Sequence, residues 1–170
     1  KYMGNITNGA DLYDFEGYKI YRATDFEFND AYNITDGDGN PTFLEPYVQN
    51  GVRAQWDLVD GKSGWHPVDL NGIKFYLGDD TGLTHSYVDH NVVNGQRYYY
   101  AVVSYDYGGD LSNNIIPSDS PMKLRVNPLT GSVSLGPNVV EVVPSPPSAG
   151  FVDASFAGDQ VDHVLGASSG

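Results

Sequence analysis

The sequence predicts an all-β protein, built as a sandwich of short antiparallel strands. Short segments alternate apolar and polar residues, turn dipeptides such as Asp-Gly and Asn-Gly separate them, and no segment has the period and length of an ordinary helix. The chain has 170 residues, of which 40% are hydrophobic, and it contains 13 Tyr, 7 Phe and 2 Trp. These side chains suffice for a packed core and exclude a chain that is disordered throughout.

The first predicted strand covers residues 16–23, where Tyr18 and Ile20 share one face. Residues 24–72 carry many turn signals and are too long for a plain connection in a compact domain. We therefore expect an insertion that contains small hairpins, with short strands near residues 52–58.

Three further strands are predicted in the middle of the chain, at residues 73–78, 84–89 and 97–106. The last of these is the strongest strand in the sequence. Its alternation places Tyr99 and Tyr105 on one face, where they are available for a subunit or domain interface.

The C-terminal part predicts a strand at residues 122–126 and a hairpin that pairs residues 132–135 with 138–143. A Pro- and Ser-rich linker then follows at residues 144–148. The predicted organisation is an N-terminal loop, a sandwich with an insertion, a hairpin, and a linker or the start of a further module: residues 1–14, 15–127 (insertion about 24–72), 128–143 and 144–170.

Charge and composition exclude several classes of partner. The formal net charge is -13, from 22 acidic and 9 basic side chains, and such a surface repels nucleic acid and anionic membranes. The chain has no cysteine, so disulfides and thiolate metal sites are ruled out. No stretch approaches the roughly 18 apolar residues that a membrane span requires. The absence of cysteine fits many bacterial exported proteins, and an acidic surface keeps extracellular proteins soluble.

Residues 92–106 carry a family resemblance. Val92, Gly95 and Tyr98 precede an alternating strand, and the segment resembles the E–F turn and strand F of bacterial fibronectin type III domains. The resemblance implies that Tyr98 is a tyrosine-corner residue, whose hydroxyl bonds to the backbone upstream.

The resemblance extends over about residues 15–127. Residues 17–22, beginning Gly-Tyr18, resemble strand C, and residues 117–126 resemble the lead into strand G. Too few residues precede strand C to supply strands A and B of that family. Either those strands lie upstream in a longer polypeptide, or a neighbouring subunit donates the missing strand, as in filament assembly.

The best local metal motif is Asp36-Gly-Asp38-Gly-Asn40. Oxygen-bearing side chains at alternate positions match the first half of a calcium loop. Position twelve is Tyr47, where a bidentate Glu is wanted, so a pair of tight turns is the alternative. The four histidines form no zinc-binding spacing.

Aromatic side chains in the insertion suggest a second kind of site. Trp56 and Trp65, with Tyr47 and Tyr76 nearby, are candidates for stacking on sugar rings, and the alternative is a small satellite core. No Gly-x-Ser-x-Gly elbow and no phosphate-binding glycine loop is present.

We therefore expect a non-catalytic extracellular module: a spacer, an adhesive domain or a subunit of a surface assembly such as a filament. Its expected partners are neighbouring domains or identical subunits, with Ca²⁺ as a candidate ligand. The alternative function is a carbohydrate-binding module of a secreted enzyme, with a glycan as its partner.

Overall fold

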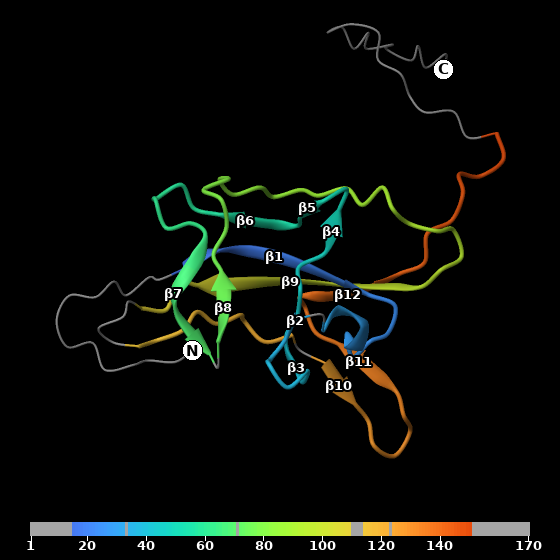
Figure 1. Ribbon diagram of the computed structural model, residues 1–170. Helices are drawn as coiled ribbons and strands as arrows, with labels where there is room; N and C mark the ends of the chain where they lie inside the picture. Colours follow the sequence, from blue (N-terminus) through green and yellow to red (C-terminus); the bar gives the residue numbers. More distant parts are fainter. Residues whose placement is uncertain (1–14, 33, 71, 110–113, 123, 151–170) are drawn as a thin grey trace, which may run out of the picture.

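The computed structural model describes residues 15–32, 34–70, 72–109, 114–122 and 124–150. Within them the structure is all-β, as predicted, and the one helical element is a single 3-10 turn, η1 (Asn29–Ala31) (Figure 1). No helix among the described residues is long and apolar enough to cross a membrane. The strands are β1 (Phe15–Ala23), β2 (Ile34–Thr35), β3 (Pro41–Phe43), β4 (Val48–Gln49), β5 (Val52–Arg53), β6 (Gln55–Asp57), β7 (Trp65–Leu70), β8 (Ile73–Tyr76), β9 (Tyr98–Asp106), β10 (Leu124–Val126), β11 (Val133–Leu135) and β12 (Val139–Val142).

The central element is a four-stranded sheet with the order β12-β9-β1-β6, in which all neighbours are antiparallel. Its two long strands, β1 and β9, lie side by side across the middle of the molecule (Figure 1). They correspond to the predicted strands at 16–23 and 97–106, which are confirmed. The pairing sets Lys19 opposite Val103, and its register shifts between Phe15 and Gly17.

The two faces of this sheet differ in burial. Ala101 and Val103 lie on the covered face, where they are 0% and 1% exposed. Val102 lies on the other face of β9 and is 49% exposed. Successive side chains of a strand point to opposite faces, so alternate residues of β9 lie on a packed face and on an open face. The buried core cluster on the packed face consists of Tyr21, Ala23, Phe28, Ala31, Tyr99, Ala101, Val103 and Val139.

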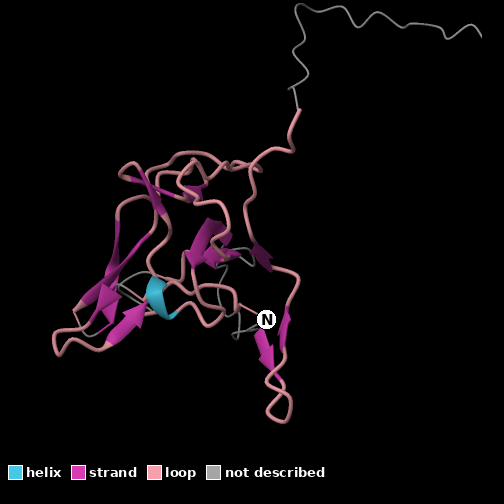
Figure 2. Cartoon of the chain, turned by 90° about the vertical axis from the view of Figure 1, so that its right-hand side faces the viewer, coloured by secondary structure: helices cyan, strands magenta, loops and turns pink. Residues whose placement is uncertain are grey.

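The long insertion carries hairpins, as predicted. β2 pairs with β3 and β4 pairs with β5, each as a small two-stranded sheet, and β7 pairs with β8 at the end of the insertion. Figure 2 shows how much of the chain consists of the loops that connect these short strands. The hairpins leave one edge of the main sheet, that of β6, without a further strand among the described residues.

The expected hairpin between residues 132–135 and 138–143 is wrong. β11 pairs with β10 across a tight turn, where the Gly131 N–H bonds to the Asn127 carbonyl at 2.8 Å. β12 instead pairs with β9 in the main sheet. Gly136 and Pro137 separate the two segments, so each finds a different partner.

Residues 118–120 and β12 occupy the same edge of β9. The Ser120 N–H bonds to the Ser104 carbonyl at 2.7 Å, and the Val102 N–H bonds to the Asn138 carbonyl at 3.0 Å. One edge strand is thus interrupted by the excursion that carries β10 and β11. The strand predicted at residues 122–126 is found as β10, but it pairs with β11 and not with β9, and the edge strand resumes at Asn138.

Residues 84–89 were predicted as a strand and form none. Side chains hold this segment instead. The Gln49 amide donates to the Val88 carbonyl at 3.1 Å and accepts from the His90 N–H at 2.6 Å. These contacts replace a backbone ladder.

The expected interface role of Tyr99 and Tyr105 is also wrong, because both are buried within the chain, at 6% and 2% exposure. They lie on the packed face of the sheet, where Tyr99 clusters with Phe28 and Ala31 of the insertion and the Tyr105 ring lies 5.7 Å from that of Phe75 on β8. The predicted N-terminal loop, residues 1–14, and residues 151–170 of the predicted linker or further module lie outside the described residues.

Candidate functional site: a groove along the edge of β6

The two tryptophans singled out by sequence lie in different places. Trp65 on β7 is 59% exposed, and its ring packs on Tyr76 with ring centroids 5.0 Å apart. Trp56 on β6 is half-buried, and its ring contacts Tyr87 at 5.4 Å. Trp56 lines the groove described next and Trp65 does not, so the structure does not bring the two rings into one site.

That cavity is a groove of about 540 Å³ along the free edge of β6, which we call the β6 groove. The β4–β5 hairpin, β6, the end of β8 and the loop after it form its walls. The groove is lined by Gln49, Asn50, Gly51, Val52, Arg53, Gln55, Trp56, Tyr76, Gly78, Asp79, Thr81 and Tyr87.

Aromatic rings form one wall of the β6 groove. Tyr87 stands edge-on to Trp56 and to Tyr47, whose centroid is 6.4 Å away. The Tyr87 hydroxyl is buried and has no hydrogen-bond partner among the described residues, and burial raises its pKa. This wall therefore presents apolar ring surface, and the unpartnered Tyr87 hydroxyl is buried.

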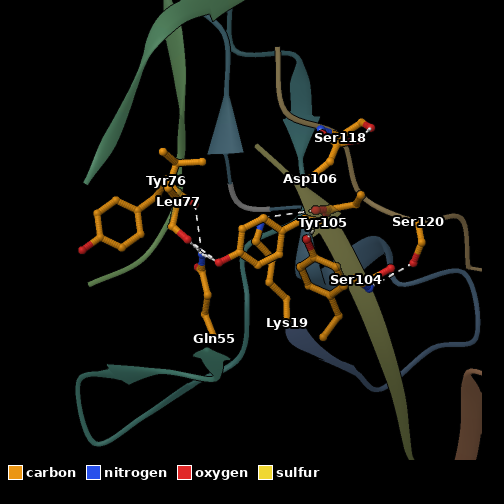
Figure 3. A network of polar contacts seen from close by, with 11 residues as sticks. Lys19, Gln55, Tyr76, Leu77, Ser104, Tyr105, Asp106, Ser118 and Ser120 are labelled. Atoms are coloured by element: carbon orange, nitrogen blue, oxygen red, sulfur yellow. Dashed lines mark hydrogen bonds and ion pairs between the residues drawn. The ribbon is translucent and has the colours of Figure 1, made fainter. Parts of the chain in front are cut away.

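Gln55 forms the polar base of the groove. Its amide nitrogen lies within bonding distance of the carbonyls of Tyr76 (3.0 Å) and Leu77 (2.8 Å) and of the Tyr105 hydroxyl (3.1 Å). Figure 3 shows Gln55 and Tyr105 converging on the Leu77 carbonyl. These contacts fix the amide's orientation, and its Oε1 is left buried without a partner.

Asp57 holds the loop that closes the groove. Its carboxylate accepts the N–H groups of Asp80 (2.6 Å) and Thr81 (2.8 Å) and the Thr81 hydroxyl (2.7 Å). Gly78 passes directly over this carboxylate at a φ of +140°, and a Cβ there would overlap it. Glycine is therefore required at this position, both for its conformation and for its size.

Glu16 lies near Asp57 and is fully buried. Both of its carboxylate oxygens have no partner among the described residues. Burial is the main cause that raises its pKa, to about 7, and the negative charge of Asp60 adds to it, while Lys62 opposes the shift. Glu16 is not among the side chains that line the β6 groove.

A second buried charge lies on the packed face of the sheet. Lys19 is 3.2 Å from Asp119 and 3.5 Å from the centre of the Phe75 ring. Burial lowers its pKa to about 8, against the opposing effect of Asp119. Tyr21 donates to the same Asp119 carboxylate. This network ties residues 118–120 to β1.

Asp89 accepts hydrogen bonds from three side chains on the open face of the sheet. Its carboxylate accepts Arg22 (2.8 Å), Tyr100 (2.7 Å) and Tyr47 (3.0 Å), and Arg22 also stacks on the Tyr47 ring at 3.8 Å. This cluster anchors the loop before β9 and positions Tyr47 beside the aromatic wall.

The candidate calcium loop is folded on itself. The Asp36 carboxylate accepts the N–H groups of Asp38 (3.0 Å) and Asn40 (2.9 Å), and the Asn40 amide also donates to it. The bonds from Asn40 lower the pKa of Asp36. Among the described residues, no group of three or more His, Asp or Glu is arranged to hold a metal ion. These contacts favour the turn interpretation, and calcium stays a prediction.

The residues singled out for structural roles make local contacts. The Tyr98 hydroxyl accepts the Val93 N–H at 3.0 Å, which is an upstream backbone bond of the expected kind. Gly95 sits in the turn before β9 at a φ of +83° and donates to the Pro144 carbonyl at 2.8 Å. Tyr18 lies on the open face, with its ring 4.9 Å from that of Phe15.

Sequence reasoning missed Gln55, Tyr87 and Glu16. A buried Glu and a Gln within a strand pattern give no signal of their own, because their burial depends on which loops cover them. Tyr87 was placed in a strand that does not form.

The contacts define the class of this protein as an all-β chain of antiparallel sheets, an architecture consistent with a β-sandwich. Comparison with protein families, curated proteins and solved structures finds no match.

Proposed function

We propose that this chain is a non-catalytic structural and interaction module of an extracellular or cell-surface assembly. The observation that supports the proposal is the open face of the four-stranded sheet. Residues around Asp89 cover only part of this face. In a sandwich such a sheet is completed by a second layer, which would come here from a neighbouring domain or an identical subunit.

The open face carries adjacent apolar side chains on three strands. Ile20 of β1 lies directly opposite Val102 of β9, and Val140 of β12 lies opposite Tyr100 on the same face. Val102 and Val140 are 49% and 51% exposed. Contiguous exposed apolar surface of this kind is typical of protein interaction sites.

The side chains of this face are suited to packing against a second β-sheet. Branched side chains interleave well between packed sheets, whereas charged residues are scarce at the centre of protein interfaces. In its more specific form, the proposal is that a neighbouring subunit adds a strand at the free edge of β12. Location outside the cell is supported by the net charge of -13 and the absence of cysteine.

The non-catalytic part of the proposal is supported by the state of the acidic groups. Glu16 is fully buried, and the Asp57 oxygens are occupied by backbone and hydroxyl donors. A general acid or base must reach the proton that it transfers, and neither carboxyl group is placed for that.

The proposal is tested with Val102→Asp, which places a charge at the centre of the open face. Leu129→Asp is the matched control, since Leu129 is 94% exposed at the tip of the β10–β11 turn. We expect light scattering and micrographs to show that the native protein associates through this face, and that only Val102→Asp disrupts the association. Native particles in which the face is open to solvent would contradict the proposal.

A further inference from the structure

We propose that the β6 groove binds a short, neutral oligosaccharide. Trp56 lines the groove and lies opposite Tyr18, so the aromatic wall adjoins the β6 end of the open sheet face. The sugar-binding proposal rests on the lining of the groove and does not depend on the proposed association.

The size and lining of the groove fit a small ligand. Its volume of about 540 Å³ lies within the range of roughly 300–1,000 Å³ that ligand pockets occupy. Rings of Trp56, Tyr76 and Tyr87 line it. A pyranose ring presents a face of C–H groups, and such faces pack on aromatic rings, while its hydroxyls point outward to polar groups.

Two polar atoms in the groove lack partners. The Gln55 Oε1 and the Tyr87 hydroxyl are both buried and unbonded among the described residues, and Gln55 is only 7% exposed. A buried polar group without a partner costs free energy, so a ligand that supplies one gains affinity. Sugar hydroxyls both donate and accept, so they suit an amide oxygen as well as a phenol.

The charges of the groove favour a neutral ligand. Arg53 lies 3.9 Å from Glu45 and over the Tyr76 ring at 5.1 Å, and Asp79 accepts the Tyr76 hydroxyl. Both charged groups at the groove therefore already have partners. The net charge of -13 repels acidic sugars and phosphates.

A peptide added as a strand along β6 is the competing occupant, because that edge has no strand partner among the described residues. The aromatic wall and the unpartnered amide oxygen favour the sugar. Backbone pairing would leave the Tyr87 hydroxyl and the rings without a specific role.

The test uses Trp65→Phe, which leaves Trp56 as the sole tryptophan and keeps an aromatic ring at position 65, next to Tyr76. Cellohexaose, xylohexaose, mannohexaose and chitohexaose are titrated while Trp56 fluorescence is recorded. We expect at least one of them to change the fluorescence saturably, and the unsubstituted protein to bind the same sugar in calorimetry with the same affinity.

Two substitutions then locate the site. Trp56→Ala, read by calorimetry, is expected to weaken binding about tenfold or more, because it removes the stacking surface. Tyr87→Phe removes only an unpartnered hydroxyl, so we expect weaker sugar binding with no loss of melting temperature. Trp65 lies outside the groove but packs on Tyr76, which lines it, so Trp65→Ala is expected to weaken binding much less than Trp56→Ala.

The proposal is overturned if none of the four sugars binds, if Trp56→Ala and Tyr87→Phe bind as tightly as the unsubstituted protein, or if Trp65→Ala weakens binding as much as Trp56→Ala. It is also overturned if extended peptides, and not sugars, bind and quench Trp56.

Discussion

Replacing Glu16 with Gln tests the electrostatics beneath the β6 groove. Glu16 is fully buried with no partner for either oxygen, and its pKa is raised from 4.5 to about 7. Because the folded-state pKa lies above the unfolded one, the folded protein holds this proton more tightly. The stability that results is complete below pH 4.5 and is lost as the pH rises through 7.

The size of the effect follows from that window. The shift from 4.5 to about 7, at about 1.4 kcal/mol per pKa unit, corresponds to a ceiling of about 3 kcal/mol. Asp60 and Lys62, which act on Glu16, are partly exposed, so solvent screens their contribution. Between about pH 5.5 and pH 8, we expect the free energy of unfolding of Glu16→Gln to rise by about 1–2 kcal/mol relative to the unsubstituted protein.

Urea unfolding followed by tryptophan fluorescence measures this difference at the two pH values. Glu141→Gln removes the same charge from an exposed position on β12 and is expected to change the free energy of unfolding by no more than about 0.5 kcal/mol at either pH. An effect of Glu16→Gln that is the same at both pH values would refute the reasoning.

Three further predictions concern stability. Gly78→Ala is expected to destabilise the protein by about 2–4 kcal/mol in urea unfolding, since the added Cβ overlaps the Asp57 carboxylate and the φ of +140° disfavours Ala; a loss below about 1 kcal/mol would show that the cradle relaxes freely. Tyr98→Phe is expected to cost about 1 kcal/mol by the same measurement, because a backbone N–H loses its acceptor, and an unchanged midpoint would argue against a structural role. Calcium and chelator are expected to give the same melting temperature, because Asp36 is already bonded within its turn; a rise with calcium that Asp38→Ala abolishes would establish the metal site instead.

The strands with clear alternation could be predicted from the sequence. β1 and β9 carry their burial pattern in their own residues, since Lys19 and Tyr21 face one side and Tyr18 and Ile20 the other. The alternation shows which residues of a strand lie on the same face of the sheet, but it does not show which face is covered. Tyr105 looked available for an interface only because the loops that bury it are distant in sequence.

Strand pairing near the C-terminus could not be predicted, because it depends on a free edge elsewhere. The segment at β12 has the same local pattern whether it pairs with β11 or with β9. Only the vacant edge of β9 beyond Ser120 decides between them.

The candidate site was predicted in part. Trp56 was identified from its residue type, and it does line a groove. Gln55 owes its role to the Leu77 carbonyl and the Tyr105 hydroxyl, which long-range packing brings to it. Such polar contacts leave no pattern in a single sequence.

The proposed association through the open face is tested most simply by asking whether that face is protected from a reagent in the native assembly. The chain has no cysteine, so Val102→Cys introduces a single thiol at the centre of that face, and Leu129→Cys provides an exposed reference. We predict that in the native assembly a thiol reagent labels Leu129→Cys rapidly and Val102→Cys slowly, and that Val102→Cys becomes reactive when the assembly is dissociated. Equal, rapid labelling of both thiols in the native assembly would contradict the account.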